Sequence, residues 1–128
     1  MIVAGIGCRK GASADDIGAV IGAALARAGF GTQALDLIAA PELKRDEQGV
    51  AAAAAALGVP LVLIAEADLK AAGARVETRS ERVLALVGVS SVAEAAALAG
   101  GGPTARLILP RIAVGSATCA LAVSEERS

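Results

Sequence analysis

The chain has 128 residues, which fits one domain, because domains commonly hold about 100 to 200 residues. Hydrophobic residues make up 55% of the sequence, but only 1% is aromatic, and histidine, tryptophan and tyrosine are missing. These absences exclude a Ser-His-Asp triad, histidine-ligated zinc and nucleic-acid binding by aromatic stacking. The net charge of −1 argues against a broad basic surface for nucleic acid or anionic lipid. We therefore expect one domain over 1–128, with a frayed tail at 124–128, and local anion recognition only.

Neither a membrane segment nor a secretory signal is predicted. The apolar stretch 50–65 is interrupted by a glycine and a proline and is shorter than the roughly 20 residues of a transmembrane helix. Arg9 follows the N-terminal apolar stretch, which reverses the order found in a signal peptide. Cys8 and Cys119 stand alone, without the C-x-x-C spacing of a zinc site. We expect a cytoplasmic protein with free thiols, no metal and no cofactor.

The N-terminal part of the chain predicts strands and helices in alternation, a pattern typical of helices that cover a largely parallel sheet. Its first strand is continuous and uncharged, so we place it in the centre of the sheet. Ser13 is predicted to cap the next helix, with Asp16 completing a capping box, and Asp46 is predicted to cap the alanine-rich helix. The predicted elements are a strand over 2–7, a helix that ends at Gly29, a strand over 34–39 with Asp36 as its one polar interruption, a helix over 51–57, a strand over 60–65 and a short helix over 66–72.

The C-terminal part of the chain predicts the remaining elements. Because only 110–115 separate the last two strands, and a parallel crossover requires about a dozen residues, the last strand should be antiparallel to its neighbour. Its alternating polar and apolar residues are typical of an edge strand. The elements are a loop over 74–79, a helix or, less favoured, a strand over 80–86, a helix over 92–99 with Ser91 and Glu94 as its capping box, and strands over 105–109 and 116–123. The predicted fold class is α/β: one three-layer α/β/α domain with a mostly parallel, mixed sheet of about five strands and an antiparallel last strand.

Three loops that precede helices hold the candidate ligand contacts. Backbone N–H groups beside basic side chains at a helix start form a site for a carboxylate or phosphate, and open α/β sheets bind ligands at the carboxyl ends of their strands. The alternatives are a tight turn with a solvated basic pair in the first loop, a solvated charge run in the second and a plain capping box in the third. The candidate binding residues are Gly7, Cys8, Arg9, Lys10, Gly11 and Ser13 in the first loop, Lys44 in the second, and Ser90 and Ser91 in the third.

Two more specific interpretations of the first loop, a dinucleotide-binding fingerprint and a nucleophilic cysteine, have less support in the sequence. Gly5, Gly7 and Gly11 resemble a dinucleotide-binding fingerprint, but their spacing has one residue too many. Cys8 precedes two basic residues at a predicted helix start, a setting that favours a thiolate. Because the chain has no histidine to serve as its base, a cysteine hydrolase is poorly supported, and we interpret Cys8 as a packing residue.

Four motifs follow one another along the chain: GIGCRKG at 5–11, KRDEQG at 44–49, GVSSVAEAAAL at 88–98 and ATCALA at 117–122. Together they resemble the CobE family, which is similar to the C-terminal domain of CbiG. The resemblance implies a protein of cobalamin (vitamin B12) biosynthesis, at the corrin-ring stage. In CbiG-type proteins the lactone of cobalt-precorrin-5A is hydrolysed and acetaldehyde is released. Relatives often carry a hydroxyl residue shortly before the lysine of the second motif, where this chain has 39–41, Ala-Ala-Pro.

The resemblance and the loops agree on one property of the ligand. Precorrins carry many carboxylate arms around an extended apolar ring, so their binder needs several separated anion sites. We therefore expect the chain to bind a precorrin or a tetrapyrrole of the hydrogenobyrinic acid type, with other corrin-pathway enzymes as further partners and no nucleic-acid or membrane partner. The candidate cations are Arg9, Lys10, Lys44 and Arg111.

Two other classes of function stay open. The first is a precorrin lactone hydrolase like CbiG, whose general base would be Asp46, Glu47 or Glu94, since no histidine is present. The second and more remote class is a nucleotide-binding regulatory domain that uses the glycine-rich turn. A visible-band shift without turnover would indicate a binder, and acetaldehyde release would indicate the hydrolase.

Overall fold

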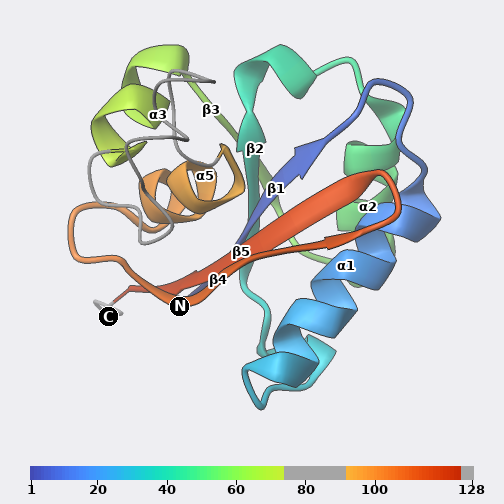
Figure 1. Ribbon diagram of the computed structural model, residues 1–128, viewed down its shortest axis with the longest axis horizontal. Coiled ribbons are helices and arrows are strands. Elements are labelled where there is room, and N and C mark those ends of the chain that lie inside the picture. The colour runs from blue at the N-terminus through green and yellow to red at the C-terminus, as the bar shows by residue number, and fades with distance from the viewer. Residues whose placement is uncertain (74–91, 125–128) are drawn as a thin grey trace.

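The computed structural model describes residues 1–73 and 92–124. Their five strands form one sheet of order β3-β2-β1-β5-β4 (Figure 1). β1 lies in the centre, as predicted, and pairs in parallel with β2 and antiparallel with β5. The sheet is mixed, because β2 and β3 are also parallel whereas β4 and β5 are antiparallel. The strands are β1 (Ile2–Cys8), β2 (Leu37–Pro41), β3 (Leu61–Ile64), β4 (Arg106–Val114) and β5 (Ala117–Val123).

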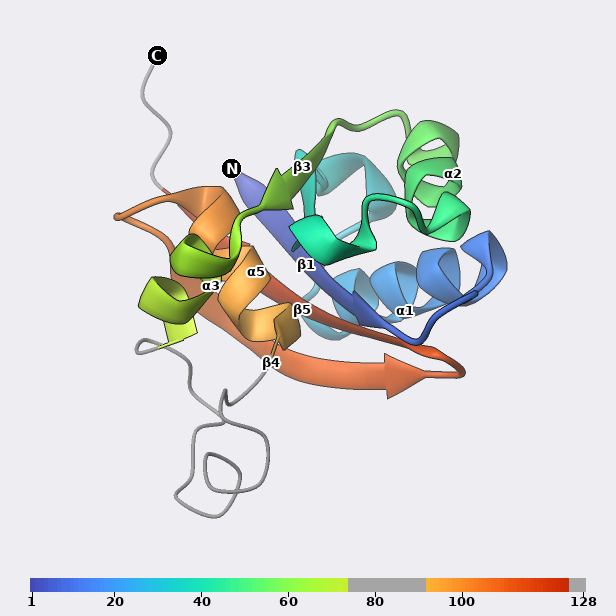
Figure 2. The same ribbon diagram turned by 90° about the horizontal axis from the view of Figure 1, so that it is seen from above.

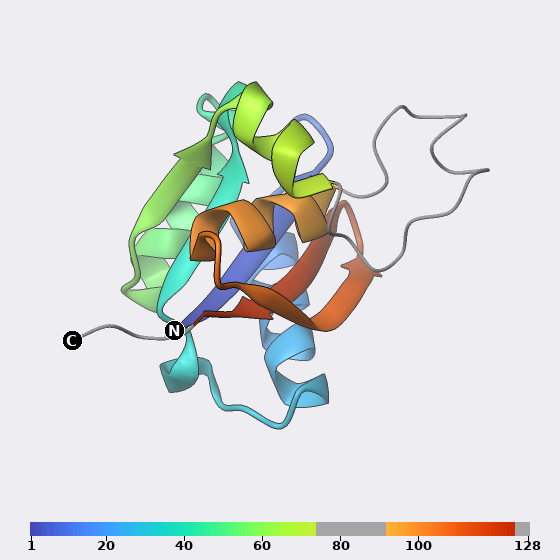
Figure 3. The same cartoon turned by 90° about the vertical axis from the view of Figure 1, so that its left-hand side faces the viewer.

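Helices cover both faces of the sheet, which confirms the three-layer α/β/α architecture (Figures 2 and 3). α1 (Ala14–Arg27) and α2 (Gln48–Leu57) lie on one face, and α5 (Val92–Gly101) lies on the other face with α3 (Glu66–Gly73) packed against it. Two short 3-10 turns, η1 (Thr32–Ala34) and η2 (Glu42–Lys44), flank β2. Within the described ranges, no helix has the length and apolar character needed to span a membrane. The predicted loop 74–79 and helix 80–86 lie outside the described residues.

Side chains of β1 alternate between the two helical layers. Those at even positions join the core under α1 and α2, whereas Val3 joins the core under α5. At Gly5 the strand has no room for a side chain, because an added Cβ would collide with the carbonyl oxygen of Ala93 and the amide nitrogen of Ala97 in α5. α5 can therefore cross directly over the central strand. The even positions are Ile2, Ala4 and Ile6.

β2 begins later than predicted. The expected strand over 34–39 starts instead at Leu37, because η1 ends at Ala34 and two residues connect it to the strand. Asp36 does not interrupt the strand but stands just before it, where its carboxylate accepts a hydrogen bond from the amide of Ile2 at 2.8 Å. The one polar residue of this run therefore anchors the start of β1.

Two predicted helix caps differ from the structure. The Ser13 hydroxyl accepts a hydrogen bond from the amide of Asp16 at 3.0 Å, as predicted, and Ser13 is the N-cap residue of α1. The Asp16 carboxylate does not complete a capping box, because it accepts hydrogen bonds from the amide and hydroxyl of Ser116. Asp46 does not cap α2 either, because the N-cap residue is Glu47, which makes no side-chain cap bond.

The last strand is internal, so the prediction of an edge strand over 116–123 is wrong. β5 lies between β1 and β4, and the edges of the sheet are β3 and β4. The polar residues that suggested a solvent-facing side have partners inside the protein. The Thr118 hydroxyl donates to the carbonyl oxygen of Gly7 at 3.2 Å, and the Ser116 hydroxyl donates to Asp16 at 2.7 Å.

β4 is longer than the predicted strand over 105–109. It continues to Val114, so the connection to β5 shrinks to a turn at Gly115 and Ser116, and the two strands are antiparallel, as predicted. The register shifts between Leu107 and Ile112, around Pro110. A proline lacks the amide hydrogen that a ladder requires, so it is tolerated at an irregularity of an edge strand.

The two ends of the described chain lie side by side. The ammonium group of Met1 donates to the carbonyl oxygen of Ser124 at 3.0 Å, and the amide of Ser124 donates to the carbonyl oxygen of Met1 at 3.0 Å. Ser124 is buried, so it does not belong to a frayed tail, and 125–128 lie outside the described residues.

Candidate functional site

The carboxyl ends of β1, β2 and β3 form one edge of the sheet, which we call the carboxyl edge. The loop 9–13 leaves β1 there, and the segment 42–47 leaves the parallel strand β2 beside it. α5 begins at the same edge, since a Cβ at Gly7 would lie 3.9 Å from the amide nitrogen of Ala93. The topology thus brings the first two predicted loops together with the start of α5. Ser90 and Ser91, the candidates of the third loop, lie outside the described residues.

A hydrogen bond joins the first two loops. The amide of Gly11 donates to Oε1 of Glu47 at 2.7 Å, across 36 residues of sequence. Gly11 has φ +79°, a left-handed conformation that glycine adopts without strain. The start of α2 also packs closely on the first loop, because a Cβ at Gly49 would collide with the carbonyl oxygen of Ala12. The two loops therefore form one surface.

The thiol of Cys8 lies within the electrostatic reach of the second loop. Burial raises its pKa, the ammonium group of Lys44 lowers it by a smaller amount, and the carboxylate of Glu47 raises it. The expectation that this position favours a thiolate is therefore wrong, because Cys8 is the half-buried last residue of β1 and not a residue at a helix start. Burial also raises the pKa of Cys119, to about 12, and both cysteines are free.

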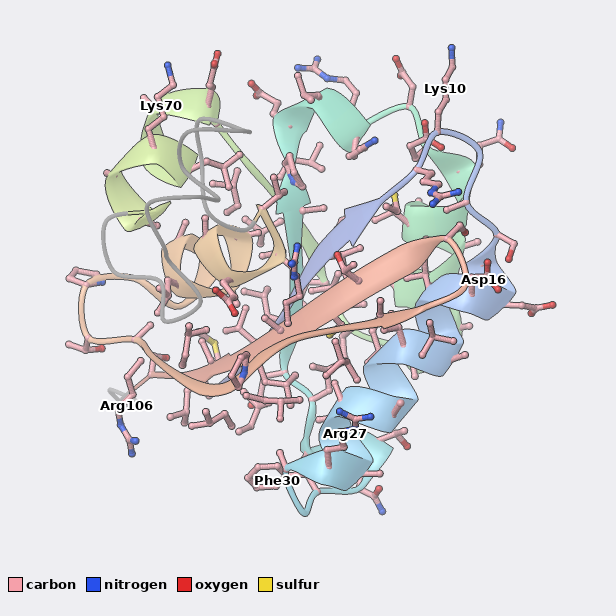
Figure 4. The ribbon with its side chains drawn as sticks, viewed as in Figure 1. Lys10, Asp16, Arg27, Phe30, Lys70 and Arg106 are labelled. Atoms are coloured by element: carbon pink, nitrogen blue, oxygen red, sulfur yellow. The ribbon has the colours of Figure 1, made fainter. Side chains whose placement is uncertain are left out.

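Three predicted cations lie at the carboxyl edge. Arg9 and Lys10 are exposed and Lys44 is half-buried, and none of them forms an ion pair within 1–73 and 92–124. Lys10 extends from its loop away from the body of the protein (Figure 4). The three cations are therefore free of ion pairs among the described residues, although the carboxylate of Glu47 lies at the same edge.

The first loop offers fewer free amides than a phosphate-binding turn. The amide of Arg9 donates to the carbonyl oxygen of Ser116, and the amide of Ala12 donates to the carbonyl oxygen of Arg9. The amide of Gly11 is held by Glu47. The groups of this loop that are free to contact an anion are therefore mainly its basic side chains, and the Gly11 amide is the backbone donor that the half-buried side chain of Glu47 covers.

Exposed apolar side chains accompany these cations, and sequence reasoning missed them. Leu43, in η2, is 83% exposed. Leu63, near the carboxyl end of β3, is 38% exposed, and Val92, at the start of α5, is 37% exposed. The available signal was Leu43 itself, a leucine within a charged turn. The carboxyl edge thus combines positive charge with apolar surface.

The remaining predicted residues have different surroundings. Glu94 is fully buried, and its Oε2 accepts a hydrogen bond from the amide of Arg111 at 2.9 Å, so its described bond leads to β4. Arg111 is exposed on the edge strand β4, which β5 separates from β1. Asp46 is exposed beside Glu47 in the second loop. Within the described parts of the chain, no three acidic or cysteine side chains gather in a way that could hold a metal ion.

Residues 2–122 match the family described as cobalamin synthesis G C-terminus. The chain is 38% identical over 121 residues to the protein CobE of a Sinorhizobium species, and the alignment covers 94% of this chain and 79% of that protein.

Solved structures with the same fold come from the same pathway. The crystal structure of CobE, a protein from the cobalamin (vitamin B12) biosynthetic pathway, has a TM-score of 0.84 and 36% identity over 98% of this chain and 93% of that one. A cobalamin biosynthesis protein from Agrobacterium tumefaciens has a TM-score of 0.79 and 44% identity over 98% of this chain and 100% of that one. A cobalamin biosynthesis protein G homologue from Sulfolobus solfataricus has a TM-score of 0.72 and 28% identity, over 98% of this chain but 37% of the homologue.

Proposed function

This chain belongs to the family of CobE and the CbiG C-terminal domain and is a protein of cobalamin biosynthesis, and we propose that it binds a polycarboxylate tetrapyrrole at its carboxyl edge. The ligand is a precorrin or a corrin of the hydrogenobyrinic acid type, exchanged with other enzymes of the pathway. One observation supports the proposal: at the carboxyl edge Arg9, Lys10 and Lys44 have no ion-pair partners among the described residues, and the exposed Leu43 precedes Lys44 in η2.

The surface matches the two chemical parts of such a ligand. Carboxylate arms form charge-assisted hydrogen bonds with lysine and arginine, which are stronger than bonds between neutral groups. The apolar ring gains free energy when it covers exposed aliphatic carbon. A nucleotide fits less well, because two glycines of the apparent fingerprint have packing roles: Gly5 leaves room for α5, and Gly7 leaves room for the Thr118 hydroxyl.

The test is a titration of the protein with hydrogenobyrinic acid, followed by its visible absorption. Arg9→Glu and Lys44→Glu should each weaken binding by roughly 1.5 to 3 kcal/mol if the lost contact is partly buried. Arg27→Glu is the matched control, because it makes the same charge change in the last turn of α1, far from Lys10 (Figure 4). Its affinity should stay close to that of the original protein. Full affinity in both Arg9→Glu and Lys44→Glu would contradict the proposal.

Salt supplies a second measurement of the same contacts. Exposed charges are screened at higher ionic strength, with a Debye length of about 10 Å at 0.1 M. We expect the affinity for hydrogenobyrinic acid to fall as sodium chloride rises, and to fall less steeply in Lys44→Glu than in the original protein. Equal salt dependence of the two proteins would argue against a contact between Lys44 and the ligand.

Lactone hydrolysis is the second candidate, because the family match is to the C-terminus of the G protein. The chain spans 37% of the Sulfolobus homologue, so the activity of a whole G-type protein does not follow from the match. Glu94 is fully buried, which leaves the exposed Asp46 and the half-buried Glu47 as possible bases. Incubation with cobalt-precorrin-5A separates the two functions: a binder shifts the visible bands without releasing acetaldehyde, and a hydrolase releases it.

A further inference from the structure

The side chain of Glu47 does not act as a helix cap, although Glu47 is the N-cap residue of α2. It precedes α2, yet its carboxylate makes no cap bond in that helix. Instead, Oε1 accepts the amide hydrogen of Gly11 at 2.7 Å in an exposed bond between the two loops of the carboxyl edge. The carboxylate forms no ion pair with a described residue, although Lys44 belongs to the same segment. A carboxylate of the protein thus occupies an exposed backbone donor within the surface that the cations line.

We propose that Glu47 is an internal competitor for the Gly11 amide, which a carboxylate of the ligand displaces when it binds. The inference rests on the proposed function and adds a regulatory contact to it. In the free protein the Glu47 carboxylate holds the two loops together; in the complex a carboxylate arm of the tetrapyrrole takes the amide, and Glu47 turns to solvent. Glu47 therefore sets the threshold concentration at which an anion is bound.

The exchange is reversible because the protein loses little free energy when the Glu47 carboxylate leaves the Gly11 amide. An exposed hydrogen bond has a small net strength, since water satisfies both partners after they separate. Glu47 is half-buried and becomes hydrated when it is released. The side chains of Arg9, Lys10 and Lys44 attract the incoming anion, so a ligand with several carboxylates outcompetes a single one from the protein.

If Glu47 is instead a clamp that holds the two loops, its removal should change the affinity for an anion in the opposite direction. If Glu47 only kept the loops in a binding-competent shape, its removal would weaken anion binding. If it competes with the ligand, its removal strengthens anion binding. A measurement of affinity in Glu47 variants therefore distinguishes the two roles.

The experiment uses propane-1,2,3-tricarboxylate as the probe and the ¹H–¹⁵N signal of the Gly11 amide as the readout. Glu47→Ala should lower the apparent Kd for the probe by about threefold to tenfold, the range expected for one exposed amide–carboxylate bond. Glu47→Gln, which keeps an uncharged acceptor, should lower it less. Asp46→Ala is the matched control, because it removes the same charge from the neighbouring exposed position. Its Kd should fall by less than half the factor seen for Glu47→Ala.

Each outcome decides the inference. A Gly11 signal that shifts at lower probe concentration in Glu47→Ala than in Asp46→Ala supports the competitor. Weaker binding in Glu47→Ala, or equal gains in the two alanine variants, overturns it in favour of a clamp or of general charge repulsion. The proposed function is tested separately, by the hydrogenobyrinic acid titration of Arg9→Glu and Lys44→Glu. A positive Gly11 result without corrin binding would leave the competitor in place and refute the tetrapyrrole.

Discussion

Gly5 is the residue at which the central strand and α5 come closest. A methyl group there would meet backbone atoms of Ala93 and Ala97, which cannot move aside as a flexible side chain can. We expect Gly5→Ala to lower the free energy of unfolding by roughly 3 kcal/mol, measured by urea denaturation. Gly18→Ala is the control: it lies in α1 with nothing within 4 Å of an added Cβ, so it should raise stability by about 0.5 to 1 kcal/mol. Similar small effects of both changes would contradict the close approach of α5.

Cys8 reports on its two charged neighbours. Its pKa is raised by burial, lowered by Lys44 and raised by Glu47, so the two variants should shift it in opposite directions. Alkylation with iodoacetamide across pH should place the Cys8 pKa higher in Lys44→Ala and lower in Glu47→Gln than in the original protein. Buried Cys119 should stay unmodified in the folded protein and serves as the internal control. A shift in the same direction in both variants would show that these side chains do not surround the thiol as described.

Among the contacts between elements, one polar link joins α1 to the hairpin of β4 and β5. Oδ2 of Asp16, in the first turn of α1, accepts the hydroxyl of Ser116 at 2.7 Å and the amide of Ser116 at 3.1 Å. These two hydrogen bonds favour the charged carboxylate and lower the pKa of Asp16. Because the pKa is lower in the folded protein than in the unfolded chain, the link stabilises the fold above the unfolded pKa of about 3.9, and this contribution is lost as the pH falls through the folded pKa.

Removal of the hydroxyl should weaken this pH dependence. In Ser116→Ala the pKa of Asp16 should rise toward its ordinary value, because the hydroxyl is the largest cause of the shift. The loss of stability below pH 4 should shrink accordingly. Ser116→Thr keeps a hydroxyl and should restore both properties. A ¹³C titration of the Asp16 carboxyl in the three proteins measures the effect, and an unchanged pKa in Ser116→Ala would mean that the hydroxyl does not bind the carboxylate in solution.

At the scale of the whole molecule, the sheet order predicts a gradient of protection. β1 and β5 are paired on both sides, whereas β3 is an edge strand that spans Leu61–Ile64 only. Amide hydrogen exchange should therefore be slowest in β1 and β5 and faster in β3, because edge strands open at lower free-energy cost. Hydrogen exchange followed by NMR measures this order. Protection of β3 equal to that of β1 would indicate that another chain pairs with this edge.

Much of the fold follows from local signals. Continuous apolar residues predict that 2–7 is a central strand, a short connection predicts the antiparallel last strand, and Ser13 predicts the start of α1. Each of these signals lies within a few residues of the element it describes. The same holds for Arg9 and Lys44, since they come two and five residues after predicted strands, and parallel strands bring their carboxyl ends together.

Hydrogen bonds between residues that are far apart in the sequence depend on the tertiary structure alone. A local pattern assigned Asp16 to a capping box, but packing gives its carboxylate to Ser116, 100 residues away. Glu94 also accepts a hydrogen bond from the amide of Arg111 in β4, a contact that no local pattern predicted. Glu47 reaches Gly11 because two parallel strands place their loops side by side, and the hydroxyl of Thr118 finds the carbonyl oxygen of Gly7 because β5 pairs with β1. A sequence shows which groups need a hydrogen-bond partner; which partner each one finds depends on how the elements pack, because many groups of suitable chemistry compete and only the folded chain brings one of them within 3 Å.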